Sequence, residues 1–187
     1  MTHEGERQAA GLPRLSARDQ ERFGESVLPH LDAAYNLARY LMRDADEAED
    51  AVQDAFLRAV RHFGGFRGSD GRAWLLSIVR NACFTRMRQR RTGGGAVEFD
   101  EEAHTPREQE FGPEADLARN RGAASVRLAL GELAVEFREA LVLRELEGLS
   151  YKEIAKVTGV PIGTVMSRLA RGRQQLAAIL VAARGGD

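Results

Sequence analysis

Arginine and hydroxyl side chains recur at helical spacing near the C-terminus of the chain. The segment Gly148–Leu176 reads GLSYKEIAKVTGVPIGTVMSRLARGRQQL, and its apolar Val165 and Leu169 fit the inner side of a helix. The polar residues that this helix would turn outward are Thr164, Ser167, Arg168, Arg171 and Arg173. Arginine can hold guanine or a phosphate with two hydrogen bonds, and serine or threonine can bond a base edge or the backbone. The pattern predicts a helix that lies in the major groove of DNA.

The residues before this helix predict a second helix that would position it. Ser150 to Glu153 has the S-x-x-E spacing of a capping box, which begins a helix. Gly159 can end that helix with a positive φ, and Pro161 can open the next one. We interpret the segment as a helix-turn-helix. The alternative is a helical hairpin whose arginines form a solvated surface, but cap, corner glycine and basic second helix all favour DNA binding.

Charged residues are sorted into blocks of one sign, although the 187-residue chain has a formal net charge of -1. Arg80–Arg91 contains five arginines and no acid, whereas Asp44–Asp50 contains five acids and no base. Glu98–Glu110 contains six acids and one arginine. Such blocks predict separate partners of opposite charge rather than one generally basic body.

Apolar residues recur at helical spacing through most of the chain, and no segment favours strands, so the predicted fold class is all-α with two small helical domains. Pro29 is expected to kink the helix predicted for residues 19–42. The predicted organisation is an N-terminal extension (1–17), a first domain (18–91), a mobile acidic linker (92–113) and a helix-turn-helix domain (114–183). Within the first domain, the glycine-rich Phe63–Gly71 is expected to be a loop.

Composition argues against several classes of protein. The single cysteine, Cys83, excludes an internal disulfide, and the four histidines are scattered, so neither a metal site nor another cofactor is expected. No apolar run reaches the roughly 20 residues that cross a bilayer, and the N-terminus lacks the apolar core of a signal peptide. We therefore expect a cytoplasmic protein.

Two motifs in order resemble a known family. Asp44–Phe63 (DADEAEDAVQDAFLRAVRHF) followed by Phe66–Arg91 resembles the second conserved region of bacterial RNA polymerase sigma factors, and the helix-turn-helix resembles the fourth region. The short linker, with no domain between, resembles the extracytoplasmic-function (ECF) class. The resemblance covers residues 23–91 and 114–180; Ala51 is a small departure, where a larger aliphatic residue is frequent.

The resemblance implies a role for each region. It implies that one face of the acidic helix docks on the β′ clamp of core RNA polymerase through Glu47, Asp50, Gln53, Asp54 and Arg58. It implies that the loop and the following helix bind the downstream promoter element, where a base flips into a protein pocket. The residues assigned to that element are Phe66, Ser69, Asp70, Arg72, Arg80, Asn81, Arg86, Arg88, Arg90 and Arg91. Phe63 and Trp74 are expected in the core. The resemblance also implies that the helix-turn-helix binds the upstream promoter element.

The expected partners are core polymerase, including its β subunit, promoter DNA and an anti-sigma factor that could hold the protein at the membrane. One alternative is a stand-alone helix-turn-helix regulator, which would need a sensor or receiver domain that the first half does not resemble. Another is an enzyme built on Cys83, His62 and Asp50, in which neighbouring arginines lower the thiol pKa; no orienting group accompanies them. A purely helical adaptor would leave the arginine clusters without a role.

Overall fold

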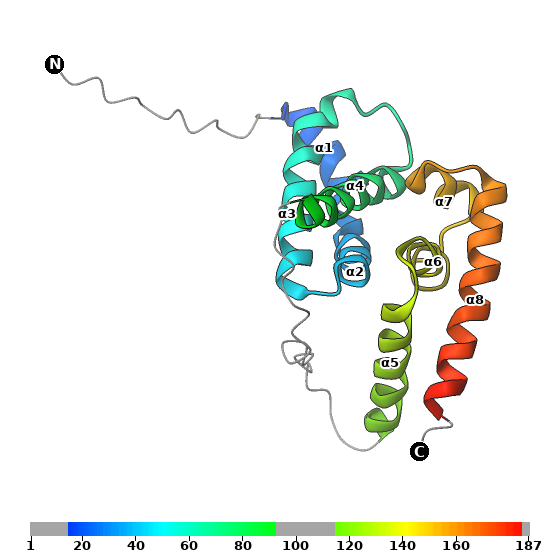
Figure 1. The fold of residues 1–187 in the computed structure, drawn as a ribbon. Coiled ribbons are helices and arrows are strands. Elements are labelled where there is room, and N and C mark those ends of the chain that lie inside the picture. Colours follow the sequence, from blue (N-terminus) through cyan, green and yellow to red (C-terminus); the bar gives the residue numbers. More distant parts are fainter. Residues whose placement is uncertain (1–14, 93–114, 185–187) are drawn as a thin grey trace.

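The described part of the protein is helical throughout. The computed structural model describes residues 15–92 and 115–184, and neither range contains a strand, which confirms the all-α prediction. Figure 1 shows the helices packed together in one body. In chain order they are α1 (Ala17–Ser26), η1 (Leu28–His30), α2 (Leu31–Met42), α3 (Ala45–His62), η2 (Phe63–Gly65), α4 (Gly71–Thr92), α5 (Ala115–Glu132), α6 (Val135–Leu141), η4 (a π-helical turn, Val142–Leu146), α7 (Tyr151–Thr158) and α8 (Ile162–Arg184).

Prolines set two of the helix boundaries. Pro29 lies in the first turn of η1, and the expected kink is a full break between α1 and α2. Proline cannot continue the hydrogen-bond ladder of α1, so the chain changes direction there. Pro161 precedes α8 rather than opening it as expected, because its carbonyl accepts the first hydrogen bonds, from the N–H groups of Thr164 and Val165.

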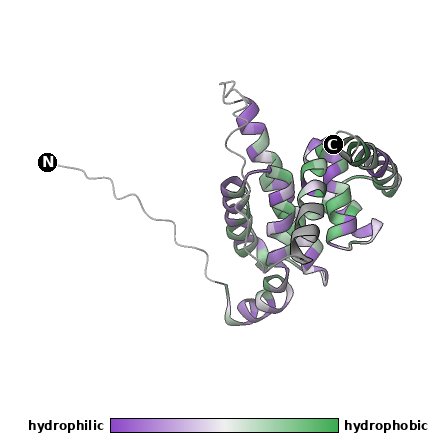
Figure 2. Ribbon diagram, turned by 90° about the horizontal axis from the view of Figure 1, so that it is seen from below, coloured by the Kyte–Doolittle hydropathy of each residue, from purple (hydrophilic) through white to green (hydrophobic). Residues whose placement is uncertain are grey.

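The first half of the chain packs α2 and α4 against the alanine face of α3. Ala48, Ala51, Ala55 and Ala59 are completely buried, and such small side chains let neighbouring helices approach closely. Asp44 begins α3 by accepting a hydrogen bond from the N–H of Glu47 at 2.9 Å. Purple and green turns alternate along the helices in Figure 2, so the helices carry both polar and apolar residues.

The second half packs α5, α6 and α7 against α8. Val165 and Leu169 of α8 are 1% exposed, as their spacing predicts. Leu141 and Leu143 are buried in the same cluster. This packing fixes α8 on its inner side and leaves its outer side free to carry polar residues.

The two halves pack on each other through one continuous hydrophobic cluster. α4 lies against α7, and α2 lies against α6. Polar groups cross the contact as well: Arg138 of α6 donates to the carbonyl of Tyr40 in α2 at 3.1 Å. The sequence does not reveal this contact, and the predicted linker falls outside the described residues except for Thr92. The domain boundaries therefore stay a prediction.

Candidate nucleic-acid interface

The corner between α7 and α8 has the predicted geometry. The N–H of Glu153 donates to the Ser150 hydroxyl at 3.3 Å, and the N–H of Ser150 donates to the Glu153 carboxylate at 2.7 Å. These hydrogen bonds hold the pKa of Glu153 below its usual value. Gly159 ends α7 with φ 70°, a conformation that other residues rarely adopt. The result is a rigid turn that aims the beginning of α8 at solvent.

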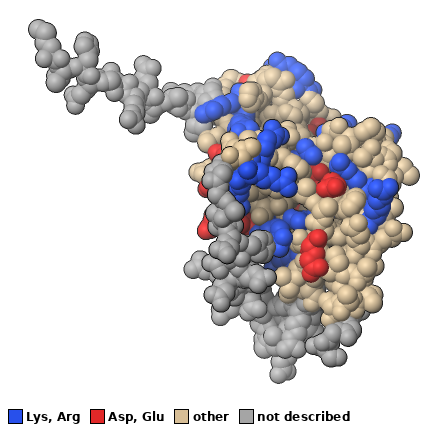
Figure 3. Space-filling model, viewed as in Figure 1, with Lys and Arg blue, Asp and Glu red and all other residues tan. Residues whose placement is uncertain are grey.

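The outer side of α8 carries the side chains predicted to read DNA. Ser167, Arg171 and Arg173 are exposed, whereas Thr164 and Arg168 are half-buried. Arg173 is engaged by the carboxylate of Glu145 at 2.7 Å, and Arg171 has no ion pair within the described ranges. Arg171 and Ser167 are therefore the predicted residues most available to DNA. Figure 3 shows Lys and Arg outnumbering Asp and Glu on one face of the molecule.

Sequence reasoning missed two exposed residues of the same helix. Met166 is 54% exposed and adjoins Ser167, and Gln174 is exposed one turn after Arg171. A helical projection centred on the buried Val165 and Leu169 would have found them.

The loop after α3 borders a cavity, at the place where the family resemblance predicts a pocket for a flipped base; the role of the cavity stays a prediction. A hollow of about 380 Å³ is lined by Gly68, Ser69, Asp70, Ala73, Trp74, Ser77 and Lys156. We call it the base cavity. Asp70 also begins α4, because its carboxylate accepts from the N–H of Ala73 at 2.9 Å. Lys156 belongs to α7, so the second half of the chain contributes to this cavity, which loop composition alone could not predict.

The aromatic residues of this region form one packed group. Phe63 is completely buried, as predicted. Its ring lies 5.9 Å from that of Trp74 and 5.7 Å from that of Phe66, and the Phe66 and Trp74 rings are 4.7 Å apart. Phe66 is therefore half-buried, and much of its ring is already in contact with protein. In this conformation Phe66 supports the loop more than it offers a free stacking surface.

Several arginines predicted to hold the downstream DNA strand are paired with carboxylates. Arg80 binds the fully buried carboxylate of Glu139 at 2.5 Å, and Arg72 binds that of Glu147 at 3.0 Å. Both acids come from the second half of the chain. Asn81, Arg88 and Arg91 are exposed and have no ion pair among the residues described. These three are free to meet a phosphate in the packed arrangement.

The predicted polymerase face of α3 is partly covered by α4. Arg86 binds Asp54 at 2.9 Å, Asp50 at 3.3 Å and Glu47 at 3.7 Å. Arg90 also reaches Glu47 at 3.3 Å. The sequence predicts DNA binding for Arg86 and Arg90 and polymerase binding for these acids, but in the structure the arginines and the acids form ion pairs with one another. The structure thus leaves Gln53 and Arg58, both exposed, as the free members of this face.

Cys83 does not have the lowered thiol pKa that the enzyme alternative requires. Its side chain is completely buried, and burial raises the pKa of the thiol to about 12, although Arg86 acts in the opposite direction. A thiol held neutral is a poor nucleophile. In residues 15–92 and 115–184, His, Cys, Asp and Glu form no group of three that could hold a metal. None of the helices described is long and apolar enough to span a membrane.

A helix-turn-helix that exposes arginines, joined to a helical unit with a loop cavity and basic helix, defines a DNA-reading protein. Comparison with protein families narrows this class: the chain matches "Sigma-70 region 2" over residues 27–92 and "Sigma-70, region 4" over residues 123–176. The chain belongs to the bacterial RNA polymerase sigma factors of the ECF class.

Relatives of similar length support this assignment. The chain is 35% identical to the RNA polymerase sigma-H factor of Pseudomonas aeruginosa, covering 94% of each protein. It is 37% identical to the ECF sigma factor SigM of Mycobacterium tuberculosis, over 88% of this chain and 80% of that one.

Solved structures resemble the fold. The sigma factor RpoE of Bartonella quintana, in complex with the anti-sigma factor NepR, has a TM-score of 0.65 and 30% identity, with 86% of this chain and 97% of that chain covered. CnrH, in complex with the cytosolic domain of CnrY, has a TM-score of 0.59 and 29% identity, with coverage of 87% and 90%.

Proposed function

We propose that this chain binds core RNA polymerase and directs it to a defined set of promoters. The observation that carries the proposal is the pairing, in one chain, of a rigid helix-turn-helix with a region 2 unit that contains the base cavity. Ser167 and Arg171 are exposed for the upstream element. Ser69, Asp70 and Trp74 surround a space for a flipped base of the downstream element.

Four of the arginines assigned to the downstream element are paired with carboxylates in the packed chain (Arg72, Arg80, Arg86 and Arg90), which is consistent with dependence on the polymerase for most of the binding surface. The formal net charge of -1 also disfavours strong independent binding to DNA. Two weak sites joined in one complex gain affinity from their connection. This reasoning favours a sigma factor over a stand-alone regulator, which would bind its operator without polymerase.

Full use of the downstream site requires the two halves to move apart. Arg72 and Arg80 cannot hold a DNA strand while Glu147 and Glu139 occupy their guanidinium groups. We propose that core polymerase binds the separated arrangement. An anti-sigma factor is the proposed regulator, by analogy with the solved relatives that were captured with NepR and CnrY. Such a factor would also give a route to membrane attachment for a cytoplasmic protein.

The test is transcription from genomic DNA by purified core polymerase, with and without the chain. We expect transcripts with defined start sites only when the chain is present. Arg171→Ala should weaken upstream-element binding by about 1–3 kcal/mol if Arg171 reads a base edge, with the loss concentrated on one base pair. A uniform loss would make Arg171 a phosphate contact. Absence of both a complex with core and a promoter-specific transcript would reject the proposed function.

A further inference from the structure

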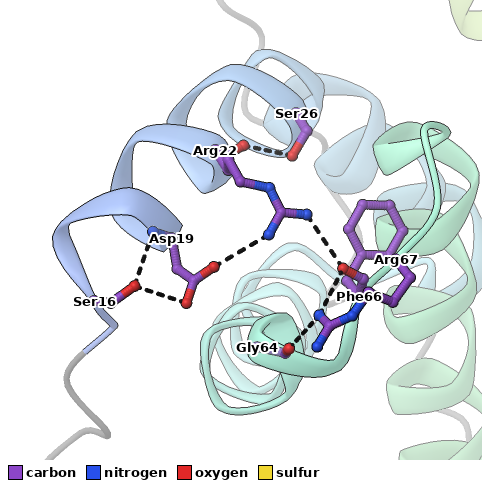
Figure 4. Close-up of polar contacts among 7 residues, drawn as sticks. All are labelled: Ser16, Asp19, Arg22, Ser26, Gly64, Phe66 and Arg67. Carbon is purple, nitrogen blue, oxygen red and sulfur yellow. Dashed lines mark hydrogen bonds and ion pairs between the residues drawn. The ribbon is translucent and has the colours of Figure 1, made fainter.

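A second hollow lies on the other side of the glycine-rich loop, between that loop and α1. It has a volume of about 580 Å³ and is lined by Ser16, Arg18, Asp19, Arg22, Gly64 and Arg67. Figure 4 shows its polar contacts. We call it the arginine hollow. Three guanidinium groups and one carboxylate give it an excess of positive charge, and none of these residues belongs to the DNA-binding or polymerase-binding sets predicted from the sequence.

The single acid of the hollow is already engaged. The carboxylate of Asp19 accepts from Arg22 at 3.2 Å and from the hydroxyl of Ser16 at 2.8 Å. Arg67 uses one terminal nitrogen, which donates to the Gly64 carbonyl at 2.5 Å, and Arg18 is exposed without an ion pair in the described part of the chain. Donors of Arg18 and Arg67 therefore remain available to an anion from outside.

The hollow is fixed in shape because the loop is fastened to α1. Arg22 donates to the carbonyl of Phe66 at 3.3 Å, and its guanidinium lies 5.4 Å from the centre of the Phe63 ring. Gly71, where the loop enters α4, touches the end of α1 so closely that a Cβ there would collide with the carbonyl of Ser26. A site held in advance loses little freedom when a ligand binds.

The arginine hollow and the base cavity share one loop. Arg67 lines the first, and the next residue, Gly68, lines the second. If a base of a nucleic-acid strand enters the base cavity, the sugar-phosphate backbone of that strand would pass over the loop toward Arg67. Guanidinium groups suit phosphate because their planar donors match its oxygens.

We infer that the arginine hollow binds a backbone phosphate of the single DNA strand whose base enters the base cavity. The inference deepens the proposed function and rests on it. Arg18 and Arg67 hold the phosphate, and Arg22 keeps the loop in place. The shared loop favours a nucleic-acid strand over an acidic peptide, because a peptide would have no base for the adjoining cavity.

The first experiment compares holoenzymes made with wild type, the double variant Arg18→Ala/Arg67→Ala, and Arg61→Ala, an exposed arginine of α3 outside the hollow. Binding to pre-melted promoter DNA is measured by fluorescence anisotropy at several salt concentrations. The double variant should bind about tenfold more weakly on every promoter sequence. Its salt slope should fall by about 0.7 for one single-strand phosphate. Arg61→Ala should behave as wild type.

The second experiment locates the phosphate. Single uncharged methylphosphonate linkages replace each phosphate of the flipped strand in turn. Wild-type holoenzyme should lose affinity at a linkage next to the flipped nucleotide, and the double variant should lose nothing more at that linkage.

Three outcomes would overturn the inference without touching the proposed function: equal affinity and salt slope for the double variant, additive losses at every linkage, or weakened binding to core polymerase instead of DNA. Failure of wild type to form a holoenzyme that binds promoters would reject the proposed function itself.

Discussion

At the scale of single residues, Arg138 contributes to both halves of the chain. Arg138 is 6% exposed, and its guanidinium donates to carbonyls at the ends of two helices: Leu130, Gly131 and Leu133 at the end of α5, and Tyr40 and Leu41 near the end of α2. Helix C-termini carry unpaired carbonyls and partial negative charge, so a cation there satisfies both. Among the residues that the structure describes, no carboxylate forms an ion pair with Arg138. Burial lowers the pKa of its guanidinium, and the positive charge of nearby Arg43 lowers it further.

We predict that Arg138→Met destabilises the protein strongly. Methionine fills similar space but leaves the buried carbonyls without donors, at a cost of about 1–3 kcal/mol for each such group before relaxation. A net loss on the order of 3 kcal/mol in the free energy of unfolding is expected. Urea denaturation followed by circular dichroism measures it. Arg127→Met, at an exposed position of α5, is the matched control and should stay within about 0.5 kcal/mol of wild type.

At the scale of the elements, the sequence predicts most of the helices but not their pairing. Ser150, Glu153 and Gly159 identify the helix-turn-helix because capping and positive φ are local requirements. The alanines of α3 identify its buried face through their spacing. Contacts of Glu139 with Arg80 and of Lys156 with the base cavity join residues more than 50 positions apart, and no local pattern specifies them.

The arginine hollow illustrates the same limit. Arg18 and Arg22 are far from Arg67 along the chain, and Arg18 directly follows the predicted N-terminal extension. Each looks like an ordinary solvated arginine until the loop folds back on α1. The base cavity could be anticipated because its polar residues, Ser69 and Asp70, are consecutive.

The outer face of α3 yields a prediction about polymerase docking. Charge-reversal variants of Asp50 and Asp54 could lose affinity for polymerase simply because the fold is weakened, since both carboxylates bind Arg86. Gln53 and Arg58 are exposed, so the pair Gln53→Arg/Arg58→Glu changes the charge pattern, lowers the net charge by only one and should leave stability unchanged. We expect affinity for core polymerase to fall about tenfold, equivalent to roughly 1.4 kcal/mol. Binding of each variant to surface-immobilised core polymerase measures this affinity, with Arg127→Glu as the control. Undiminished affinity would remove this face from the docking site.

At the scale of the whole molecule, buried charge lies where the two halves meet. Glu139 is fully buried on α6 and faces Arg80 of α4, and Glu147 is bound by Arg72 and by the side-chain amide of Asn36 at 3.3 Å. Removing charges from water is costly, and pairing returns only part of that cost. A contact built this way is specific in geometry without being strong, which suits the proposed separation of the two units when DNA binds.

The pH dependence of stability offers a test of this contact. Burial raises the pKa of Glu139 above its usual value, and the attraction of Arg80 opposes that shift only in part. A carboxyl whose pKa is raised on folding binds more protons in the folded state. Its contribution is therefore complete below the unfolded pKa, about 4.3, and is lost as pH rises through the folded pKa.

We predict that Glu139→Gln removes this part of the pH dependence. Glutamine keeps the shape and can still accept a hydrogen bond from Arg80, but it has no proton to lose. Above the folded pKa, the variant should approach or exceed wild-type stability, because no carboxylate is desolvated; near pH 4 the difference should reverse or vanish. Urea unfolding at intervals between pH 4 and 8 measures the slope, and Glu132→Gln, at an exposed position of α5, serves as the control. Parallel curves for wild type and Glu139→Gln would show that the carboxylate of Glu139 is accessible to water in solution. The two halves would then not form the closely packed contact around Glu139 and Arg80.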